Sequence, residues 1–144
     1  MGIEVKTNIN ALMKKTGGDV EKVASEIAIA KLKYLGDAFV KDARDEAVGN
    51  YTDRTVNLRS SIGYVVLHDG DVIKEYFKKD KGKGEKGVEE ARKLATLLAG
   101  QNSRGYVLIC LAGMEYALYV ELQDYNVISG SEVAVRRLWR KLFK

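Results

Sequence analysis

The stretch that decides the fold is residues 62–77, which read IGYVVLHDGDVIKEYF. Both halves are rich in residues that favour β-strands, and Asp69-Gly70 between them is a strong signal for a two-residue turn. We therefore expect an antiparallel hairpin with strands Ile62–His68 and Asp71–Phe77. The turn sets a register in which these residues face each other: His68 and Asp71, Val66 and Ile73, Tyr64 and Glu75.

A long helix is predicted before the hairpin, from about Asp19 to Val48. Gly17-Gly18 precede it, acidic residues occupy its first turn, and Gly49-Asn50 follow it. Two adjacent faces of this helix are apolar, which gives a wide hydrophobic band. The first face holds Val20, Val23, Ile27, Ala30, Tyr34 and Ala38, and the second holds Ala28, Leu32, Leu35, Phe39 and Ala43. We expect another subunit to cover part of this band, because the helix is long for so small a domain.

After the hairpin, the pattern predicts a helix from Val88 to Ala99 and a buried strand from Tyr106 to Ala112. Residues 113–121 fit either a strand or a short helix, and Ser131 then caps a C-terminal helix that reaches Lys144. The predicted class is α+β: a long N-terminal helix packed on a small, mainly antiparallel sheet, with a second helix and a C-terminal helix. The length fits a single domain, residues 1–144.

The composition is that of an ordinary globular protein, with 46% hydrophobic and 31% charged residues and a net charge of +4. No apolar run approaches the roughly 18 residues that cross a membrane, and no signal peptide is visible. Cys110 is the only cysteine and His68 the only histidine. A metal site or a nucleophilic site requires clusters of such residues. We therefore expect no enzyme, no metal and no cofactor, a buried thiol at Cys110, and a surface residue at His68.

Residues 78–87 are rich in lysine and glycine and are predicted to form a flexible loop. Within them, residues 82–87 read GKGEKG and match the dinucleotide-binding pattern G-x-G-x-x-G. That pattern requires its first glycine directly after a strand of a parallel β-α-β unit. Here four residues intervene after Phe77, and the strand belongs to a hairpin. A solvated loop is therefore favoured over a nucleotide site.

The C-terminal helix has an apolar side and a basic side. Its apolar residues are Val135, Leu138, Trp139, Leu142 and Phe143, and its basic residues are Arg136, Arg137, Arg140, Lys141 and Lys144. Cations near a helix C-terminus stabilise the helix itself, so a docked helix with a solvated basic face explains the pattern. A subunit interface, a surface that faces DNA and, less favoured, a membrane surface are the alternatives. The candidate interface residues are Arg136, Arg137, Trp139 and Arg140.

Two further stretches resemble the paired signatures of a tailed-phage family, the tail-component proteins of the head–tail joining and tail-completion (neck) group. The first signature resembles T-G-N-L-R-x-S-I after a long helix, and residues 55–62 here read TVNLRSSI. The second resembles Y-A-x-Y-V-E-F-G-T, and residues 116–124 here read YALYVELQD. The signature residues in this chain are Asn57, Leu58, Arg59, Ser61, Ile62, Tyr116, Ala117, Tyr119 and Glu121. Val56 stands where the pattern has glycine, and Gln123-Asp124 replace its glycine-threonine pair. We expect Leu58 and Ile62 to anchor the core, with Arg59 and Ser60 pointing outward.

The resemblance implies a structural protein of phage or prophage virion assembly, with a long helix on a small sheet and no cofactor. It implies a homo-oligomeric ring in the neck or at the top of the tail, in contact with other neck and tail proteins. Assembly would take place in the bacterial host cytoplasm. The alternative function is a small basic nucleic-acid-binding module, supported by the lysine-rich loop and the basic helix but weakened by 20 acidic residues.

Overall fold

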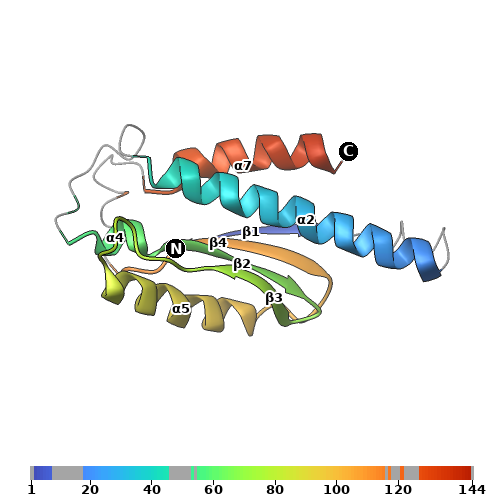
Figure 1. The fold of residues 1–144 in the computed structure, drawn as a ribbon, viewed down its shortest axis with the longest axis horizontal. Helices are drawn as coiled ribbons and strands as arrows, with labels where there is room; N and C mark the ends of the chain where they lie inside the picture. Colours follow the sequence, from blue (N-terminus) through green and yellow to red (C-terminus); the bar gives the residue numbers. More distant parts are fainter. Residues whose placement is uncertain are drawn as a thin grey trace.

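The structure, a computed structural model, describes residues 2–7, 18–45, 53, 55–115, 117, 121 and 127–143. The predicted α+β class is confirmed: α2 and α7 lie on one face of a four-stranded sheet, and α5 covers the other face (Figure 1). The elements in chain order are β1 (Gly2–Thr7), α2 (Gly18–Ala43), α4 (Asn57–Ser60), β2 (Ile62–His68), β3 (Asp71–Tyr76), α5 (Glu85–Ala99), β4 (Tyr106–Ala112) and α7 (Ser129–Leu142).

The sheet has the strand order β1-β4-β2-β3, and every neighbouring pair is antiparallel. Side chains of β4 alternate between two hydrophobic cores, one under α2 and α7 and the other under α5. Leu108 and Cys110 belong to the first core, whereas Ile109 and Leu111 belong to the second. Because both faces are covered, the strand has no polar side, which confirms the predicted buried strand.

The hairpin forms as predicted, but its register is only partly as expected. His68 pairs with Asp71, as the turn predicts, whereas Val66 pairs with Lys74 and Tyr64 pairs with Tyr76. The expected pairings of Val66 with Ile73 and Tyr64 with Glu75 are therefore wrong. A β-bulge between Val66 and Leu67 inserts one extra residue on β3 and shifts the remaining pairs. This shift places Tyr76 so that its ring stacks on that of Tyr64, with the ring centroids 6.0 Å apart.

Strand β1 was not predicted. It pairs along its length with β4 and buries Ile3 and Val5, while Glu4 and Lys6 stay more exposed. The alternation of Ile3 and Val5 with charged residues is the only local signal, and it is too short to predict a strand without the neighbouring β4.

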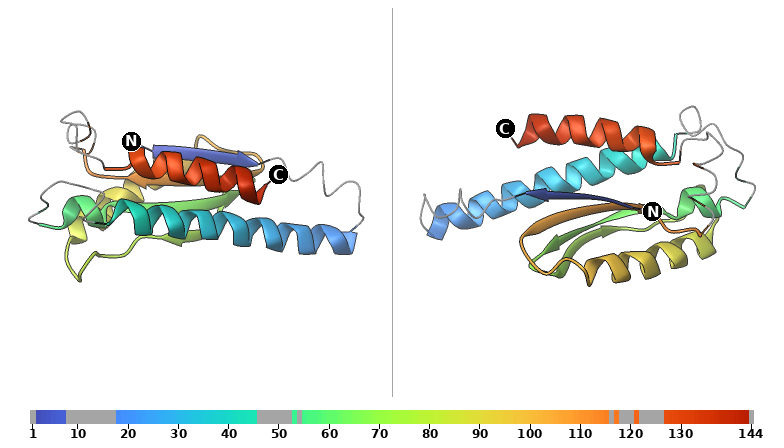
Figure 2. Two further views of the ribbon diagram at one scale, coloured as in Figure 1. Left: turned by 90° about the horizontal axis from the view of Figure 1, so that it is seen from above. Right: turned by 180° about the vertical axis from the view of Figure 1, so that it is seen from behind.

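Helix α2 ends at Ala43, earlier than the expected Val48, and Gly49-Asn50 lie outside the described residues. Beyond the helix, the Arg44 guanidinium donates hydrogen bonds to the carbonyl oxygens of Ile62 (2.9 Å) and Lys78 (2.7 Å). Figure 2 shows α7 lying beside α2 and the N-terminal end of α2 extending past the sheet. Among the described residues, no helix is long and apolar enough to cross a membrane.

Helices α5 and α7 both begin earlier than predicted. Helix α5 starts at Glu85 instead of Val88, so the lysine-glycine segment is partly helical. Helix α7 starts at Ser129, and the expected cap Ser131 lies inside it, fully buried. The Ser131 hydroxyl donates a hydrogen bond to the Asp42 carboxylate at 2.7 Å, so it joins α7 to α2 instead of capping its own helix.

Candidate functional site

The first signature forms a structural junction between the sheet and α5. Leu58 and Ile62 are 2% and 0% exposed, as expected. Arg59 and Ser60 were expected to point outward, and this is wrong, because they are 7% and 0% exposed. Residues 57–60 form the single helical turn α4, which packs against the N-terminal part of α5, and both side chains are buried in this turn.

Val56 adopts a left-handed backbone conformation immediately before α4, with φ of 60°. A β-branched residue with a positive φ is strained, and glycine is the residue that adopts this conformation at little cost. Val56 is also the position at which the resembled signature carries glycine. The backbone at position 56 therefore has the left-handed conformation that glycine adopts most easily.

Ser60 connects this junction to the lysine-glycine segment. Its hydroxyl donates a hydrogen bond to the Lys83 carbonyl oxygen at 2.7 Å and accepts one from the Asp80 backbone N–H at 2.8 Å. Residues 80–83 also close a short antiparallel bridge. The sequence predicts a flexible loop for this segment, but two of its residues form hydrogen bonds with Ser60 of α4.

Two glycines of the G-x-G-x-x-G pattern have packing roles. A Cβ on Gly87 would lie 2.0 Å from the carbonyl oxygen of Asn57, and one on Gly84 would lie 2.3 Å from Ser60 Oγ. Gly82 has open space around it. The preceding strand β3 is antiparallel to β2, unlike the parallel unit that nucleotide binding requires. Close contact with α4 therefore explains the two packed glycines without a ligand.

The second signature is only partly described, since Tyr116 and Tyr119 lie outside the described residues. Ala117 is buried, and both Ala117 and Glu121 have helical backbone, which favours the short-helix alternative for this segment. Glu121 Oε1 accepts hydrogen bonds from the backbone N–H groups of Val127, Ile128 and Ser129, the first at 2.9 Å. Its other oxygen accepts one from the Ser129 hydroxyl at 2.9 Å. Glu121 therefore caps the N-terminus of α7, where a negative charge is favourable.

The candidate interface on α7 divides into two parts. Arg136, Arg137 and Arg140 are exposed, and Arg136 forms an ion pair with Glu132 at 2.9 Å within the same helix. Trp139 is half-buried and packs on the core, and its indole nitrogen is buried without a hydrogen-bond partner among the described residues. All three arginines therefore reach the surface, whereas Trp139 is partly engaged within the chain.

Neither His68 nor Cys110 lies in a site suited to catalysis. The His68 ring stacks on Tyr106 with centroids 4.2 Å apart, and its Nε2 lies 3.3 Å from the Asp69 carboxylate. Burial raises the pKa of the Cys110 thiol well above its ordinary value, which disfavours the thiolate needed for nucleophilic attack. Among the described residues there is no group of three or more side chains suited to hold a metal ion.

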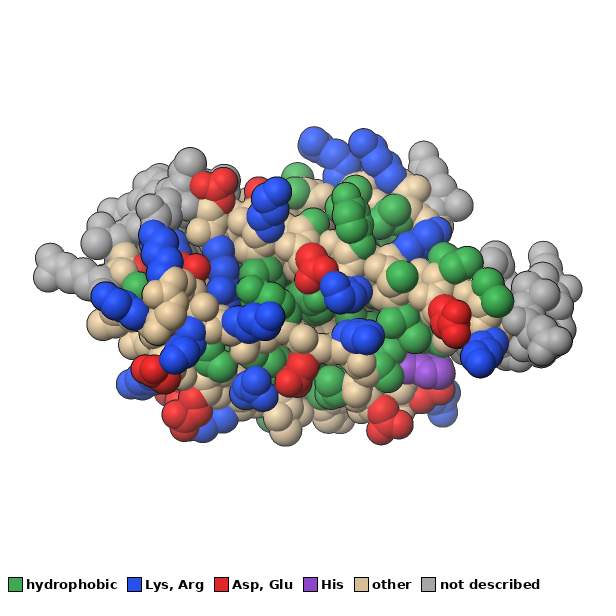
Figure 3. All heavy atoms as spheres, in the orientation of Figure 1, with side chains coloured by type: hydrophobic (Ala, Val, Ile, Leu, Met, Phe, Trp, Pro, Cys, Tyr) green, Lys and Arg blue, Asp and Glu red, His purple; other side chains and the backbone are tan. Residues whose placement is uncertain are grey.

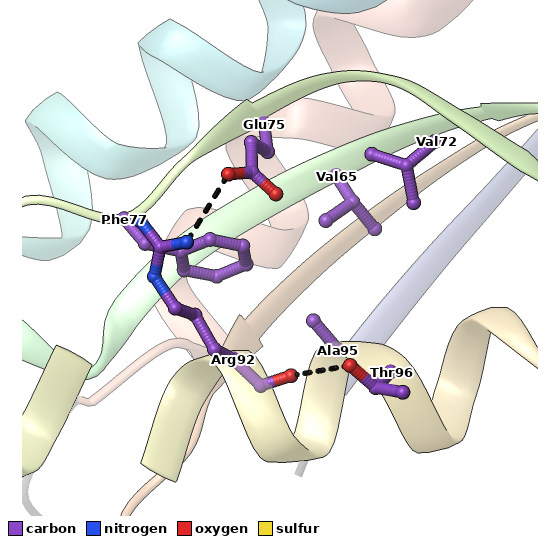
Figure 4. Close-up of a pocket in the computed structure, with 7 residues that line it drawn as sticks. All are labelled: Val65, Val72, Glu75, Phe77, Arg92, Ala95 and Thr96. Atoms are coloured by element: carbon purple, nitrogen blue, oxygen red, sulfur yellow. Dashed lines mark hydrogen bonds and ion pairs between the residues drawn. The ribbon is translucent and has the colours of Figure 1, made fainter. Parts of the chain in front are cut away.

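A shallow groove of about 290 Å³ lies between the edge strand β3 and α5 (Figure 4). Arg92 bridges it by an ion pair with Glu75 at 3.4 Å, and its guanidinium carbon lies 5.6 Å from the centre of the Phe77 ring. The Thr96 hydroxyl donates to the Arg92 carbonyl oxygen at 2.9 Å. The polar groups of the groove are thus paired with one another, and the remaining lining is apolar: Val65, Val72 and Ala95.

Helix α2 presents an apolar face to solvent. Val23, Ile27 and Tyr34 are 53%, 50% and 57% exposed, and they follow one side of the helix. In the space-filling view of Figure 3, hydrophobic side chains reach the surface between charged ones. Beside this face, a hollow of about 490 Å³ lies between α2 and α7, lined by Tyr34, Asp37, Ala38, Lys41, Asp42, Asp45 and Ala134.

Comparison with known proteins finds no relative of this chain. No protein-family model, no curated protein and no solved structure matches the chain. The candidate site is therefore defined by its own geometry: the α4 junction, the Glu121 cap, the exposed arginines of α7 and the apolar face of α2. Sequence reasoning missed Ser60, Gly84 and Gly87 as parts of the junction. The only signal was the placement of Gly87 within the first turn of a helix, where glycine is otherwise unfavourable.

Proposed function

We propose that the chain is a structural protein of tailed-phage virion assembly, a head–tail joining or tail-completion component that acts through protein–protein contacts. The observation that carries the proposal is the left-handed backbone at Val56. A likeness between two sequence patterns need not coincide with backbone geometry. Here the one departure from the first signature falls on a residue whose conformation favours the glycine of that signature.

The roles of the other signature residues also support an architectural function. Leu58 and Ile62 are core anchors, and Glu121 holds the start of α7 by accepting four hydrogen bonds. These contacts set the relative positions of the sheet and α7. The exposed apolar face of α2 then supports a protein partner, since large apolar side chains grouped at a surface are typical of interaction sites.

Val56→Gly tests the interpretation of the signature. Replacing valine removes a strain of about 1–2 kcal/mol for a left-handed conformation, offset by the roughly 0.5–1 kcal/mol entropic cost of glycine. We expect the free energy of unfolding, measured by urea denaturation, to rise slightly or stay unchanged. Val65→Gly, in a buried strand, is the matched control and should destabilise strongly. A clear loss of stability in Val56→Gly would contradict the interpretation.

The function itself is tested in the phage or prophage genome that encodes the chain. Deleting the gene is expected to leave DNA-filled heads and unattached tails, and adding the purified protein to such an extract should restore joined particles. Negative-stain electron microscopy counts the joined fraction. An undiminished number of joined particles after deletion would contradict the proposal.

A nucleic-acid contact is the second candidate, favoured by the exposed arginines of α7. Phosphate contacts make affinity strongly dependent on salt. If the basic face binds DNA, Arg137→Glu should weaken binding and reduce its salt dependence in fluorescence anisotropy. Lys93→Glu on α5, which removes a lysine paired with Glu89 and Glu90, is the control and should leave binding nearly unchanged. Equal binding by both variants and the wild type would exclude this face as the DNA site.

A further inference from the structure

The exposed apolar side chains of α2 follow the spacing of a helix–helix seam. Val23, Ile27, Ala30 and Tyr34 are separated by four, three and four residues, and all four are exposed. In a pair of packed helices, contact residues that alternate at spacings of three and four residues lie along one side of each helix. The seam lies opposite the buried face of α2, so the core of this chain does not cover it.

A row of charges runs along one border of the seam. Its members are Lys22, Glu26, Lys33 and Asp37, so the charge order along the helix is plus, minus, plus, minus. The first three are exposed and Asp37 is half-buried, and Lys33 and Asp37 also form an ion pair within the chain at 2.8 Å. If two copies of α2 pair about a twofold axis in antiparallel orientation, this row faces the same row of the other copy in reverse order. Lys22 then faces Asp37, and Glu26 faces Lys33, so every contact joins opposite charges. A parallel pairing would instead place this row against the opposite border of the second seam, so these four contacts would not form.

The hollow between α2 and α7 fits a register that differs from this one by only about two residues, or about 3 Å along the helix. When Ile27 of one copy packs on Tyr34 of the other, Val23 falls opposite Ala38, which lines the hollow. The small side chain of Ala30 lies at the twofold axis, where the two helices approach each other most closely. The N-terminal end of α2, which extends past its own sheet (Figure 2), lies beside the C-terminal half of the second α2 in this arrangement.

We propose that α2 is a self-association surface, which pairs with α2 of a second copy in antiparallel orientation to form a twofold dimer. The observation that selects this occupant is the self-complementary order of the four border charges. The dimer does not depend on the virion role, because a closed twofold contact differs from the repeated contact that builds a ring.

The association constant provides the first test. Sedimentation equilibrium of the wild type is expected to show a monomer–dimer equilibrium. Ile27→Lys places a charge in the seam of both copies and should weaken the dimer about 100-fold. The matched control is Leu97→Lys, since Leu97 is an apolar residue on α5 that is at least as exposed as Ile27 (62% against 50%). A wild type that stays monomeric at millimolar concentration, or equal effects of the two variants, would overturn the proposal. Circular dichroism melting of each variant verifies that it folds.

Thiol crosslinking determines the orientation. Cys110 is fully buried, so an introduced cysteine is the only accessible thiol among the described residues. With a short thiol crosslinker, Ala30→Cys alone should give a covalent dimer, and a mixture of Ile27→Cys with Tyr34→Cys should give a mixed dimer. Val23→Cys alone should not crosslink. Efficient crosslinking of Val23→Cys to itself would indicate a parallel pair and overturn the antiparallel register.

Charge reversal tests the border row. Glu26→Lys and Lys33→Glu should each weaken self-association several-fold, because each creates repulsion in its own homodimer. Mixing the two variants should restore association to near the wild-type level, since each then faces its opposite charge. The double variant, Glu26→Lys with Lys33→Glu, should also self-associate normally in an antiparallel pair. Loss of association in the double variant would overturn the proposed charge pairing.

Discussion

On the face of α2 that meets the sheet, Leu32, Leu35 and Phe39 are fully buried, whereas on the opposite face Val23, Ile27 and Tyr34 expose half or more of their surface. Both faces are apolar in sequence, so residue type alone does not explain the difference. The sheet contacts one side of a helix, and α2 also extends past the end of the sheet (Figure 1). The comparison shows that a helix with two apolar faces can bury only one of them on a small sheet, which leaves the other face exposed.

The largest loss of stability is expected from a substitution on the buried face of α2. Leu35→Ala should lower the free energy of unfolding by about 2–5 kcal/mol, because a fully buried leucine leaves a cavity. Its neighbour Tyr34 is exposed, and Tyr34→Ala should change stability by no more than about 0.5 kcal/mol. Urea denaturation of both variants at a low, monomeric concentration makes the comparison. Similar losses in the free energy of unfolding from the two substitutions would contradict the difference in burial between the two faces of α2.

The next largest loss of stability is expected when a contact between α2 and α7 is removed. Ser131→Ala removes the buried hydroxyl that donates to the Asp42 carboxylate, and hydrogen bonds to charged groups contribute about 1.5–3 kcal/mol. We expect the melting temperature to fall correspondingly. Ser103→Ala, at an exposed loop position, is the control and should melt like the wild type. An unchanged melting temperature in Ser131→Ala would contradict its proposed role in docking α7.

Gly36→Ala tests the packing of the buried face, because helix propensity and packing predict opposite changes in stability. Alanine is favoured over glycine in a helix by about 1 kcal/mol, but a Cβ on Gly36 would lie 2.6 Å from the Tyr64 ring. Overpacking in a core costs about 1–3 kcal/mol, so Gly36→Ala is expected to destabilise the protein. Calorimetric melting distinguishes the two predictions. A rise in melting temperature would mean that the Tyr64 ring moves aside freely.

The smallest effect concerns Asp37, at the border between the two faces. Its burial alone would raise the pKa of the carboxyl, but hydrogen bonds from Lys33 (2.8 Å) and Tyr64 (2.6 Å) and the charge of Lys33 outweigh burial and lower it. A lowered pKa in the folded state stabilises the protein above the unfolded value of 3.8, and this stability is lost as pH falls through the folded value. Asp37→Asn should therefore reduce the acid sensitivity of stability below about pH 4. Identical acid unfolding profiles of the variant and the wild type would contradict this role.

The local elements could largely be predicted from the sequence, because their signals are local. The turn at Asp69-Gly70, the 3.6-residue spacing of α2 and the apolar run of β4 each depend on neighbouring residues. The site was predicted less well, because its contacts join distant segments. Arg59 and Ser60 are polar residues in a polar stretch, yet both are buried, and Ser60 forms hydrogen bonds with Asp80 and Lys83 far along the chain. Glu121 gave no sign of its role as a cap for residues 127–129, which come six to eight residues later in the sequence.

The sequence by itself determined the hairpin, the helices, the buried strand and the presence of two apolar faces on α2, since each follows from periodicity and turn chemistry. Only the tertiary structure decided which of the two faces is buried, where the β-bulge shifts the hairpin, and that β1 joins the sheet beside β4. The physical reason is that burial and strand pairing depend on which surfaces meet. Local propensity limits the elements that form, but the choice between two equally apolar faces is made by the shape of the sheet that receives them.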